Sequence, residues 1–562
     1  MRLKFNAFSG MIPKFNPVVL PDSNAENAVN CRFESGVLQP LYGLTQDVTL
    51  ALTGHNINAI HLWDVNNNAY WLRFASKVDV IRSPIADDAY SRIYWSGDSR
   101  LGGSLIYSYT PAVYTGGGEE YPINYYKLGI PAPTQKATTT LVGTLADDVS
   151  ASARSYVYTY VGKLYEESAP VEKPSDPLIC PNEGAVVHVT NLTFDTSADT
   201  GREIEAIRLY RVIVGSSGNA DYLFVDEITK SDILGGVGKY AGNKYVDNIA
   251  DDGLSGSLDT TSWDEPRDNM YSLGLTAYGV AYAAIGKIVC LSEPFVPYAW
   301  PRDYELTCDN DVVAIGHYDN ALIVGTTGRP VMITGIDPQN MSQSELPISE
   351  ACVSAKSMVS MGRYAIYASP NGLVMASGGD AQLITGGIIT NREWANYQPD
   401  SIHAYQHRGK YIFFWKKDSV NKGGVIFDPR SPNDGLIAFN QYFVAGYRDQ
   451  DTDTLYLIDE NKVLWKFDDN NASPRTYTWK SKRISLDAPH CLTAARILAD
   501  SYTNITINIY ADNTLYHTQA VTNKSPFRLP RNGRYRVWQV EVIGVDAIRE
   551  VAISETVTEL QV

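Results

Sequence analysis

The stretch between Phe295 and Trp415 decides the fold of this chain. It contains three similar segments, FVPYAWPRDYELTCDNDVVAIGHYDNALIVGTTGRPVMITGID (295–337), ACVSAKSMVSMGRYAIYASPNGLVMASGGDAQLITGG (351–387) and SIHAYQHRGKYIFFW (401–415). In each, an apolar run ends in a tight turn of polar, charged or glycine residues, and a second apolar run follows. These turns are centred near Asp319, Arg363 and Gly409, and a fourth lies at Gln450–Asp453. A recurrence of about 44 residues, with three or four short strands in each unit, is typical of the blades of a β-propeller.

The composition is that of a folded, β-rich protein. Of the 562 residues, 44% are hydrophobic and 20% are charged, and the length predicts about three or four domains. Tyrosine is unusually common, with 37 Tyr against 15 Phe. Because the tyrosine ring packs while its hydroxyl stays hydrated, it suits pleated, half-wet surfaces. We therefore expect an all-β protein with a large exposed or intersubunit surface.

Charge and cysteine content exclude several classes of function. The net charge of −16 argues against tight nucleic-acid binding, but it allows a surface past which DNA moves without adhering. Six scattered cysteines form no CxxC pair, so we expect buried thiols in a reducing cytoplasm instead of a zinc site or a disulfide framework. The N-terminal segment has no apolar signal region, and no run of 18 apolar residues predicts a membrane span.

The rhythm of the strands divides the chain into five parts. A segment with a different spacing, which includes ARSYVYTYVGKLYEESAP (153–170), interrupts the blades and reads as a fibronectin-like or immunoglobulin-like β-sandwich. The expected parts are an N-terminal arm (1–55), the first blades and a connector (56–133), the inserted β-sandwich (134–262), the remaining blades (263–473) and a C-terminal β-sandwich domain (474–562). The predicted fold class is thus all-β, an interrupted propeller with two accessory β-domains.

A few local elements can also be predicted. Residues Ala25–Asn30 suggest one helical turn, and Cys31–Leu38 suggests a hairpin that turns at Ser35-Gly36. Asn66–Asn68 is expected to be a turn, and Pro111–Pro133, with its three consecutive glycines, a connector. The clearest helix signal is Thr390–Tyr397, which Thr390 or Asn391 would cap.

Two patterns resemble binding sites but have simpler explanations. GGVGK (235–239) lacks the first glycine of a phosphate-binding loop, because Ile233 occupies that position, and no Ser or Thr follows Lys239. A surface loop is expected there. His403 and His407 could share one face of a strand, but no third metal ligand is near and Gly409 places His407 in a turn.

A carboxylate pair could in principle cleave glycosides. Alternation would place Asp303 and Glu305 on one face, yet Arg302 offers either acid a partner, so an ion pair or a solvated face is favoured. The neighbouring aromatic residues that would suit a sugar are Tyr298, Trp300 and Tyr304. Ser369–Gly372 is expected to be a turn. Since no GxSxG, HExxH or Rossmann motif occurs, we assign no catalytic, cofactor-binding or metal-binding residues and expect no enzyme and no cofactor.

Three parts of the chain together resemble a known family. They are LPDSNAENAVNCRFESGVLQPL (20–41), the central WPRDYELTCDNDVVAIGHYDNALIVGTTGRPVMITGIDPQNMSQSELPISEACVSAKSMVSMG (300–362) with YASPNGLVMASGG (367–379), and YTWKSKRI (477–484) with FRLPRNGRYRVWQVEVIG (527–544). These segments look like the tail nozzle proteins of short-tailed bacteriophages, also called tail tubular protein B. The likeness extends over nearly the whole chain.

The resemblance implies a structural protein of the virion tail, assembled in the host cytoplasm. Its partners would be further copies of itself in a homohexameric ring, the adaptor and portal above, and tail fibres or a needle below. The ring would continue the channel through which double-stranded DNA leaves the capsid, and its acidic wall would repel the phosphates. The alternative is a carbohydrate-binding or depolymerising propeller that acts at the host surface.

Overall fold

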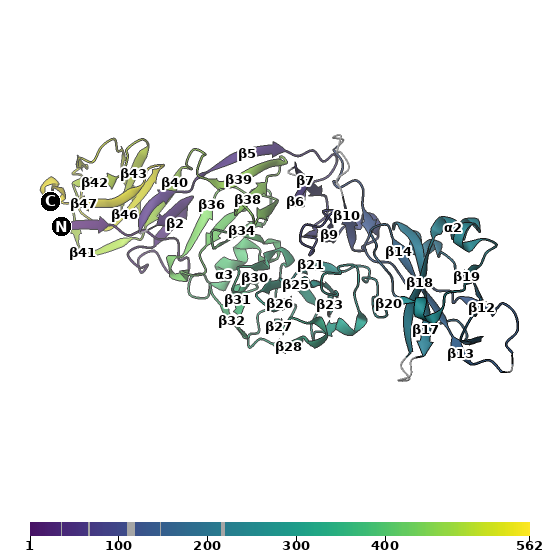
Figure 1. Ribbon diagram of the computed structural model, residues 1–562. Coiled ribbons are helices and arrows are strands. Elements are labelled where there is room, and N and C mark those ends of the chain that lie inside the picture. The colour runs from purple at the N-terminus through teal and green to yellow at the C-terminus, as the bar shows by residue number, and fades with distance from the viewer. Residues whose placement is uncertain (35, 66–67, 110–117, 147, 215–219, 562) are drawn as a thin grey trace.

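The computed structural model describes residues 1–562 except 35, 66–67, 110–117, 147, 215–219 and 562. The molecule is elongated and almost entirely β, with many small sheets (Figure 1). The inserted residues lie at one end, the propeller in the middle, and both chain termini at the other end (Figure 1). The described part of the chain contains no helix with the length and apolarity needed to cross a membrane.

Seven groups of strands in the described chain form the blades of a propeller; six are separate small sheets, and the group β33–β36 is part of a larger sheet. In chain order they are β6–β7 (Ala59–Val65, Asn68–Phe74), β8–β11 (Asp79–Arg82, Ile93–Ser96, Ile106–Ser108, Tyr126–Lys127), β21–β24 (Tyr271–Leu275, Ala281–Ile285, Ile288–Leu291, Leu306–Thr307), β25–β28 (Val312–Tyr318, Ala321–Thr326, Val331–Thr334, Ser342–Glu345), β29–β32 (Val359–Ser360, Ala365–Ser369, Gly372–Ser377, Asp380–Leu383), β33–β36 (His403–His407, Lys410–Lys416, Lys422–Phe427, Leu436–Phe439) and β37–β39 (Ala445–Asp449, Thr454–Ile458, Val463–Asp469). The first strands of neighbouring blades are in contact from β8 through β21, β25, β29 and β33 to β37, and β37 packs against β6.

The repeated turns occupy equivalent places in the blades. Asp319, Gly362, Gly409 and Asp453 each lie between the first and second strands of a blade, and all have positive φ. A positive φ is favourable for Gly and tolerated by Asp, which explains the polar and glycine character of these turns. The predicted period of about 44 residues is therefore confirmed as a blade period. The expected turn at Asn66–Asn68 falls largely outside the described residues, since 66–67 are among those excepted.

The last blade is completed by the beginning of the chain. Strand β5 (Gly43–Thr49) pairs antiparallel with β39, so residues about 420 positions apart in sequence become neighbours in one sheet. Thr45 Oγ1 donates a 2.6 Å hydrogen bond to Asp469, and the backbone N–H of Tyr42 donates to Asp468 at 2.9 Å. Because the blades form a ring, this pairing joins its two ends.

N-terminal strands also enter the C-terminal unit. In one sheet, β2 (Ala25–Val29) lies between β36 of the propeller and β40 (Tyr477–Ser481), and β46 (Tyr535–Gly544), β43 (Ile505–Ala511) and β44 (Thr514–Ala520) follow, with β41 (Ile484–His490) beside β46. The facing sheet contains β1 (Arg2–Phe5), β3 (Cys31–Glu34), β4 (Val37–Pro40), β42 (Ala494–Ala499), β45 (Phe527–Arg528) and β47 (Ile548–Ser554). The N-terminal residues are thus more than an arm.

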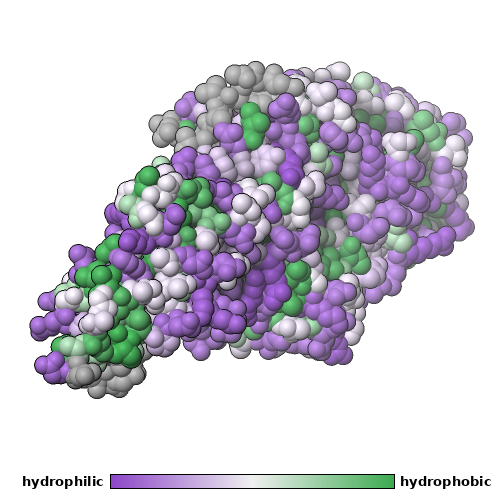
Figure 2. All heavy atoms as spheres, turned by 90° about the vertical axis from the view of Figure 1, so that its right-hand side faces the viewer, coloured by the Kyte–Doolittle hydropathy of each residue, from purple (hydrophilic) through white to green (hydrophobic). Residues whose placement is uncertain are grey.

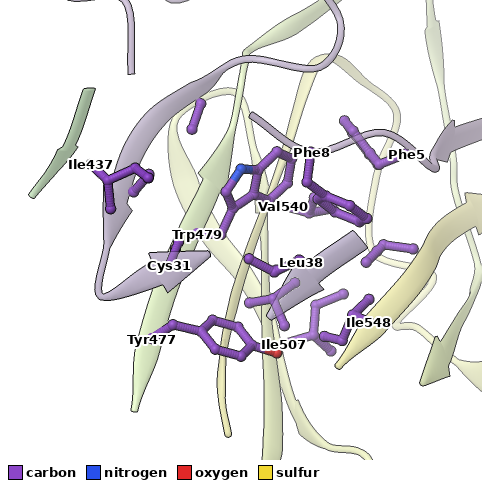
Figure 3. Close-up of a cluster of buried hydrophobic side chains, with 14 of the residues drawn as sticks. Phe5, Phe8, Cys31, Leu38, Ile437, Tyr477, Trp479, Ile507, Val540 and Ile548 are labelled. Atoms are coloured by element: carbon purple, nitrogen blue, oxygen red, sulfur yellow. The ribbon is translucent and has the colours of Figure 1, made fainter. Parts of the chain in front are cut away.

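Alternating apolar residues of these two sheets build the largest core. Trp479 is fully buried between Phe5 and Phe8, whose rings meet it edge to face at centroid distances of 6.1 and 4.9 Å (Figure 3). Its indole N–H donates a hydrogen bond to the carbonyl of Ser9 at 3.1 Å. Such a ring buries both its apolar surface and its one donor, so it fixes the N-terminal segment on the C-terminal strands.

The inserted residues form a unit between β11 and β21. One sheet pairs β12 (Thr138–Leu141), β16 (Val187–Thr190) and β19 (Tyr245–Asp247), another pairs β14 (Tyr156–Gly162), β17 (Ile204–Val214), β18 (Ala220–Thr229) and β20 (Ser255–Ser257), and β13 (Ala151–Arg154) pairs with β15 (Leu178–Pro181). Residues of these sheets share one hydrophobic cluster. Both ends of the insertion are held by residues 103–105. The backbone N–H of Leu128 donates to the carbonyl of Leu105, and the backbone N–H of Asn269 donates to the carbonyl of Gly103.

Several local predictions can be compared with this structure. The hairpin at Cys31–Leu38 is confirmed by β3 and β4, and helix α3 (Asn391–Trp394) is confirmed with Thr390 as its cap in a capping box. The helical turn at Ala25–Asn30 is wrong: these residues form β2, because pairing on both sides outweighs a weak local helix preference. The connector 111–133 contains β11, and its residues 111–117 lie outside the described part.

Tyrosines and cysteines are more buried than the composition suggests. Among the described tyrosines only Tyr165 and Tyr278 are exposed, whereas many others, such as Tyr42, Tyr70 and Tyr90, are half-buried; the expected intersubunit surface stays a prediction. Other tyrosine rings fill cores while their hydroxyls find partners, as Tyr156 does by donating to Asp247 at 2.7 Å. Five of the six cysteines are buried and all six are free thiols, as expected.

Candidate functional site

The candidate functional site is the cavity at the centre of the propeller. It has a volume of about 520 Å³ and is lined by the first strands β6, β8, β21, β25 and β37 and by residues around β29. Because most of the lining comes from the first strands of different blades, residues far apart in sequence meet at the axis. Sequence reasoning located these strands but assigned no residue of the cavity to a site.

Arg82 links three of the walls. Its guanidinium donates to the carbonyl of Leu62 at 3.3 Å, to the hydroxyl of Tyr447 at 3.2 Å and to the carboxylate of Asp451 at 3.3 Å. Arg82 thereby bridges β8 to β6 and to the end of β37, and it closes the ring where the first and last blades meet. Its contacts are partly exposed, so each adds little to stability but together they fix the geometry.

Two histidines face this region in the neutral form. His61 is buried with its ring against Tyr447 at a centroid distance of 4.6 Å, and burial, reinforced by the charge of Arg82, lowers its pKa to about 3. Burial also lowers the pKa of His317, whose Nδ1 lies 3.0 Å from the hydroxyl of Tyr282. Both rings are therefore uncharged at neutral pH and cannot donate a proton as acids.

The acids of the cavity are engaged with neighbours. Asp449 is buried and accepts hydrogen bonds from Thr452 Oγ1 at 2.5 Å and from the backbone of Asp451 at 3.3 Å. Arg448 bonds to Asp453 at 2.8 Å and to Gln406 at 2.9 Å. The cavity can hold a small polar molecule, but its groups resemble a network that holds blades together more than one that performs chemistry.

Of the two carboxylates singled out from the sequence, Glu305 belongs to an ion-pair network and Asp303 is exposed. Asp303 lies in a 3-10 turn, Arg302–Tyr304, so the expectation that strand alternation aligns it with Glu305 is wrong. Glu305 binds Arg267 through two hydrogen bonds of 2.7 and 2.9 Å and lies 3.4 Å from Arg302. Of the aromatic residues proposed to bind sugar, Trp300 and Tyr304 are buried and only Tyr298 is half-buried.

The two histidines four residues apart both belong to strand β33. His407 is its last residue and pairs with Lys410, so its expected place in the turn is wrong. His403 lies between the hydroxyl of Tyr405 and the carbonyl of Phe443, each 3.1 Å from a ring nitrogen. Within the described residues no cluster of three or more His, Cys, Asp or Glu side chains is arranged to hold a metal ion.

The two remaining sequence patterns are connections. GGVGK follows helix α2 (Lys230–Gly235) and its positive-φ cap at Gly236, and Lys239 donates to Asp226 at 2.7 Å. A phosphate site would need the start of a helix, whereas this is a helix end. Ser369–Gly372 joins β30 to β31, and Asn371 donates to Glu350 at 3.0 Å.

Comparison with known proteins gives no family. No family model matches the sequence, and no curated protein matches it. Solved structures with similarity include PorZ of Porphyromonas gingivalis (10% identity, 86% of this chain and 95% of that chain, TM-score 0.25), the Neurospora crassa Pan2 WD40 domain (9% identity, 52% and 86%, TM-score 0.25) and an exo-beta-1,3-galactanase from Phanerochaete chrysosporium (7% identity, 92% and 100%, TM-score 0.18). TM-scores this low establish neither a shared fold nor a shared function. The blades are defined by the strand pairing of this chain.

Proposed function

We propose that this chain is a structural subunit of a bacteriophage tail nozzle. In this proposal six copies form a ring that continues the DNA channel below the portal and adaptor and meets fibres or a needle at its lower end. The protein would reside in the virion and would have no enzymatic role. The sequence resemblance at 20–41, 300–362 and 477–544 is the starting point.

The observation that carries the proposal is the way distant segments are locked together. Strand β5 completes the last blade, and β2 joins the propeller sheet to the C-terminal sheet. The N-terminal ammonium of Met1 forms ion pairs with Glu555 and Glu559 at 3.0 and 2.9 Å. Separating the propeller from the C-terminal unit would break these strand pairings, which suits a part of a tail that bears force during ejection.

The resembling segments near the two chain ends coincide with these junctions, whereas the central ones, 300–362 and 367–379, lie in the blades from β24 to β31. Residues 20–41 contain β2, β3 and β4, and residues 477–484 and 527–544 contain β40 and β46. Strand β2 pairs with β40, and β40 pairs with β46, so segments from both chain ends occupy adjacent positions in one sheet. The likeness at the two chain ends therefore concerns the part that joins the units to one another.

The path of DNA in this proposal lies between subunits. The cavity at the propeller axis has a volume of about 520 Å³, which is the size of a small-molecule site. It is too small for duplex DNA, whose major groove alone is about 12 Å wide. The lumen of the ring would instead be an outer face of the subunit. The net charge of −16 supports an acidic lumen that repels phosphates.

Contacts between subunits would involve apolar side chains of the inserted unit. Its exposed large apolar residues are Val142, Leu145, Val149, Tyr165, Ile179, Leu234, Val237 and Val246. Figure 2 shows apolar residues gathered on the projecting part of the end that carries the inserted unit, beside surfaces that are largely hydrophilic. Apolar patches of this kind favour association. We also infer that this unit is a fibronectin-like sandwich, since its antiparallel sheets enclose one core.

Electron microscopy tests the proposal. The purified protein, alone or mixed with its adaptor, is expected to form closed six-fold rings, and a reconstruction of the tail is expected to place six copies around an acidic lumen. A lumen lined along its length by Lys and Arg, a copy number that matches peripheral fibres, or submicromolar binding of duplex DNA at physiological salt would refute it.

One groove favours the alternative of carbohydrate binding. It has a volume of about 520 Å³ and lies between the inserted unit and the propeller, where Trp263 and Tyr298 meet edge to face at 5.8 Å. The exposed Tyr165 and the Arg208–Glu227 ion pair of 2.9 Å line the same groove. If glycan arrays reveal binding that Trp263→Ala removes, this second candidate replaces a purely structural role.

A further inference from the structure

A second pocket lies where the N-terminal hairpin meets the propeller. Its volume is about 270 Å³, close to the lower limit for small-ligand sites. Strand β3 forms one wall, the β33–β34 turn and the β35–β36 connection form others, and the end of β39 closes it. Apolar side chains make up much of the wall: Phe33, Leu41, Ile412, Ile426, Ile437 and Phe467. Cys31 and Ile437 of this wall also appear in Figure 3.

Most charged groups around the pocket already have partners. Asp428 accepts two hydrogen bonds from Arg430, at 3.0 and 2.8 Å. Asp468 accepts one from Arg408 at 2.8 Å and one from the backbone of Tyr42. These ion pairs neutralise the rim, so neither member of each pair is free to recognise a ligand by charge.

Two nitrogen-bearing side chains of the pocket have no hydrogen-bond partner among the described residues. His407 is 4% exposed, and both of its ring nitrogens lack a partner, the carboxylate of Asp468 lying 3.7 Å from Nε2. Lys410 is half-buried and its side chain makes no hydrogen bond or ion pair with the described residues, and burial lowers the pKa of its ammonium although Asp428 and Asp468 act in the opposite direction. Unmet donors in a partly apolar site cost free energy that a suitable acceptor recovers.

We propose that this pocket binds a small monocarboxylic acid, with its carboxylate at Lys410 and His407 and its apolar body against the wall of Phe33, Leu41 and Phe467. One unpaired ammonium matches one negative charge, and a ring N–H of His407 supplies a further hydrogen bond. The volume accommodates roughly ten non-hydrogen atoms, since a water occupies about 30 Å³. Inorganic phosphate offers charge without an apolar body and would leave the wall unused.

The pocket also joins parts of the chain that are far apart in sequence. Cys31, Phe33 and Leu41 come from the N-terminal segment, whereas Lys410 and Phe467 come from the propeller. A ligand that contacts both would hold the N-terminal hairpin on the blade. This inference does not depend on the proposed tail function, and it stands or fails by a separate experiment.

The test uses acylation of lysines in the full-length protein, read by mass spectrometry. Because its pKa is lowered, Lys410 is expected to react faster at pH 7.5 than exposed lysines such as Lys417. Benzoate at millimolar concentration is expected to slow acylation of Lys410 at least fivefold and to leave Lys417 unchanged. Benzyl alcohol, the uncharged counterpart, and inorganic phosphate are expected to protect weakly.

A variant gives an independent readout. In ligand-observed NMR, Lys410→Met is expected to weaken benzoate binding at least tenfold, while the matched control Lys417→Met and the charge-retaining Lys410→Arg preserve it. Lack of protection by 10 mM benzoate would show that the pocket holds only water and would overturn the proposal. Equal protection by phosphate and benzoate would overturn the assignment of the apolar wall. The acylation measurement on the unaltered chain remains decisive if Lys410→Met fails to fold.

Discussion

The buried ion pair of the inserted unit leads to a quantitative prediction. Arg211 and Asp247 are both fully buried, and Nη1 of Arg211 lies 2.7 Å from Oδ2 of Asp247. Asp247 also accepts hydrogen bonds from Tyr156 at 2.7 Å and from the backbone of Ile249 at 3.0 Å. Asp247→Asn keeps the shape of the side chain but removes the charge that balances the guanidinium. Only Asp251, half exposed, then remains opposite Arg211, at 2.8 Å.

Breaking one member of such a pair costs about 3–5 kcal/mol, because the other charge stays buried with weaker compensation, here only from the partly exposed Asp251. For a unit of this size that corresponds to roughly 10–20 °C in melting temperature. The same loss would speed amide exchange in β14, β17 and β19 by about two to three and a half powers of ten, at 1.4 kcal/mol for each factor of ten. Calorimetry and hydrogen exchange of the full-length protein measure both effects.

The chain supplies a matched control. Asp176 forms an exposed ion pair of 2.7 Å with Lys136 in the same unit, and its side chain is 86% exposed. Asp176→Asn is expected to change stability by less than about 1 kcal/mol, because surface pairs contribute little. The double variant Arg211→Met/Asp247→Leu, which replaces both charges by apolar groups, is expected to recover much of the loss. If Asp247→Asn shifts the unfolding transition no more than Asp176→Asn, the reasoning about the buried pair is refuted.

Three further predictions follow from the way the units are joined and from the buried histidines. Replacing residues 134–262 by a short Gly-Ser linker is expected to leave a soluble, cooperatively unfolding protein, because both ends of the insertion are anchored on residues 103–105. This expectation is contradicted if the variant aggregates and the isolated 134–262 segment is also unfolded. Deleting residues 1–49 is expected to abolish cooperative melting, since it removes β5 from the last blade and β1–β4 from the C-terminal unit. If the shortened chain shows a calorimetric transition like that of the full chain, closure of the ring by β5 is dispensable. Burial lowers the pKa of His61 to about 3 and that of His403 to about 4, from 6.5, so their contribution to stability is complete above pH 6.5 and is lost as the pH falls, by about 2 kcal/mol each at pH 5. Denaturant titrations of His61→Phe should show a smaller loss of unfolding free energy between pH 7 and 5 than the unaltered chain. An identical pH profile would exclude His61 as a source of the pH dependence.

Sequence patterns predicted elements whose signals are local. The turns at Asp319 and Gly409 and the capping box of Thr390 and Glu393 were predictable because each depends on residues within a few positions. Pairing between distant segments leaves no such local signal. Ala25–Val29 has the composition of a helical turn, and only its neighbours β36 and β40 make it a strand.

The sites were less predictable than the fold for the same reason. Arg82, His61 and Asp451 meet at the propeller axis from β6, β8 and the end of β37, and no spacing in the sequence relates them. Asp303 and Glu305 were considered as a pair because they are close in sequence. Asp303 lies inside a 3-10 turn and Glu305 follows it, and Glu305 binds Arg267, a residue 38 positions away. Trp300 was likewise expected to suit a sugar because of its position beside these acids. Its ring is instead buried, and its indole N–H donates to the carbonyl of Pro297 at 2.8 Å.

The completion of the last blade by β5 has a consequence for synthesis on the ribosome. The partner of β5, Val463–Asp469, is made about 420 residues after β5 itself. At 5–20 residues per second the N-terminal strands must wait for roughly 20–80 s with unpaired backbone edges. During that time neither the ring of blades nor the C-terminal sheets can close, and two nascent chains on one message could exchange β5. The order of synthesis thus leaves the edges of the first 50 residues open to another chain, which makes slow elongation between residues 50 and 463 a route to swapped dimers.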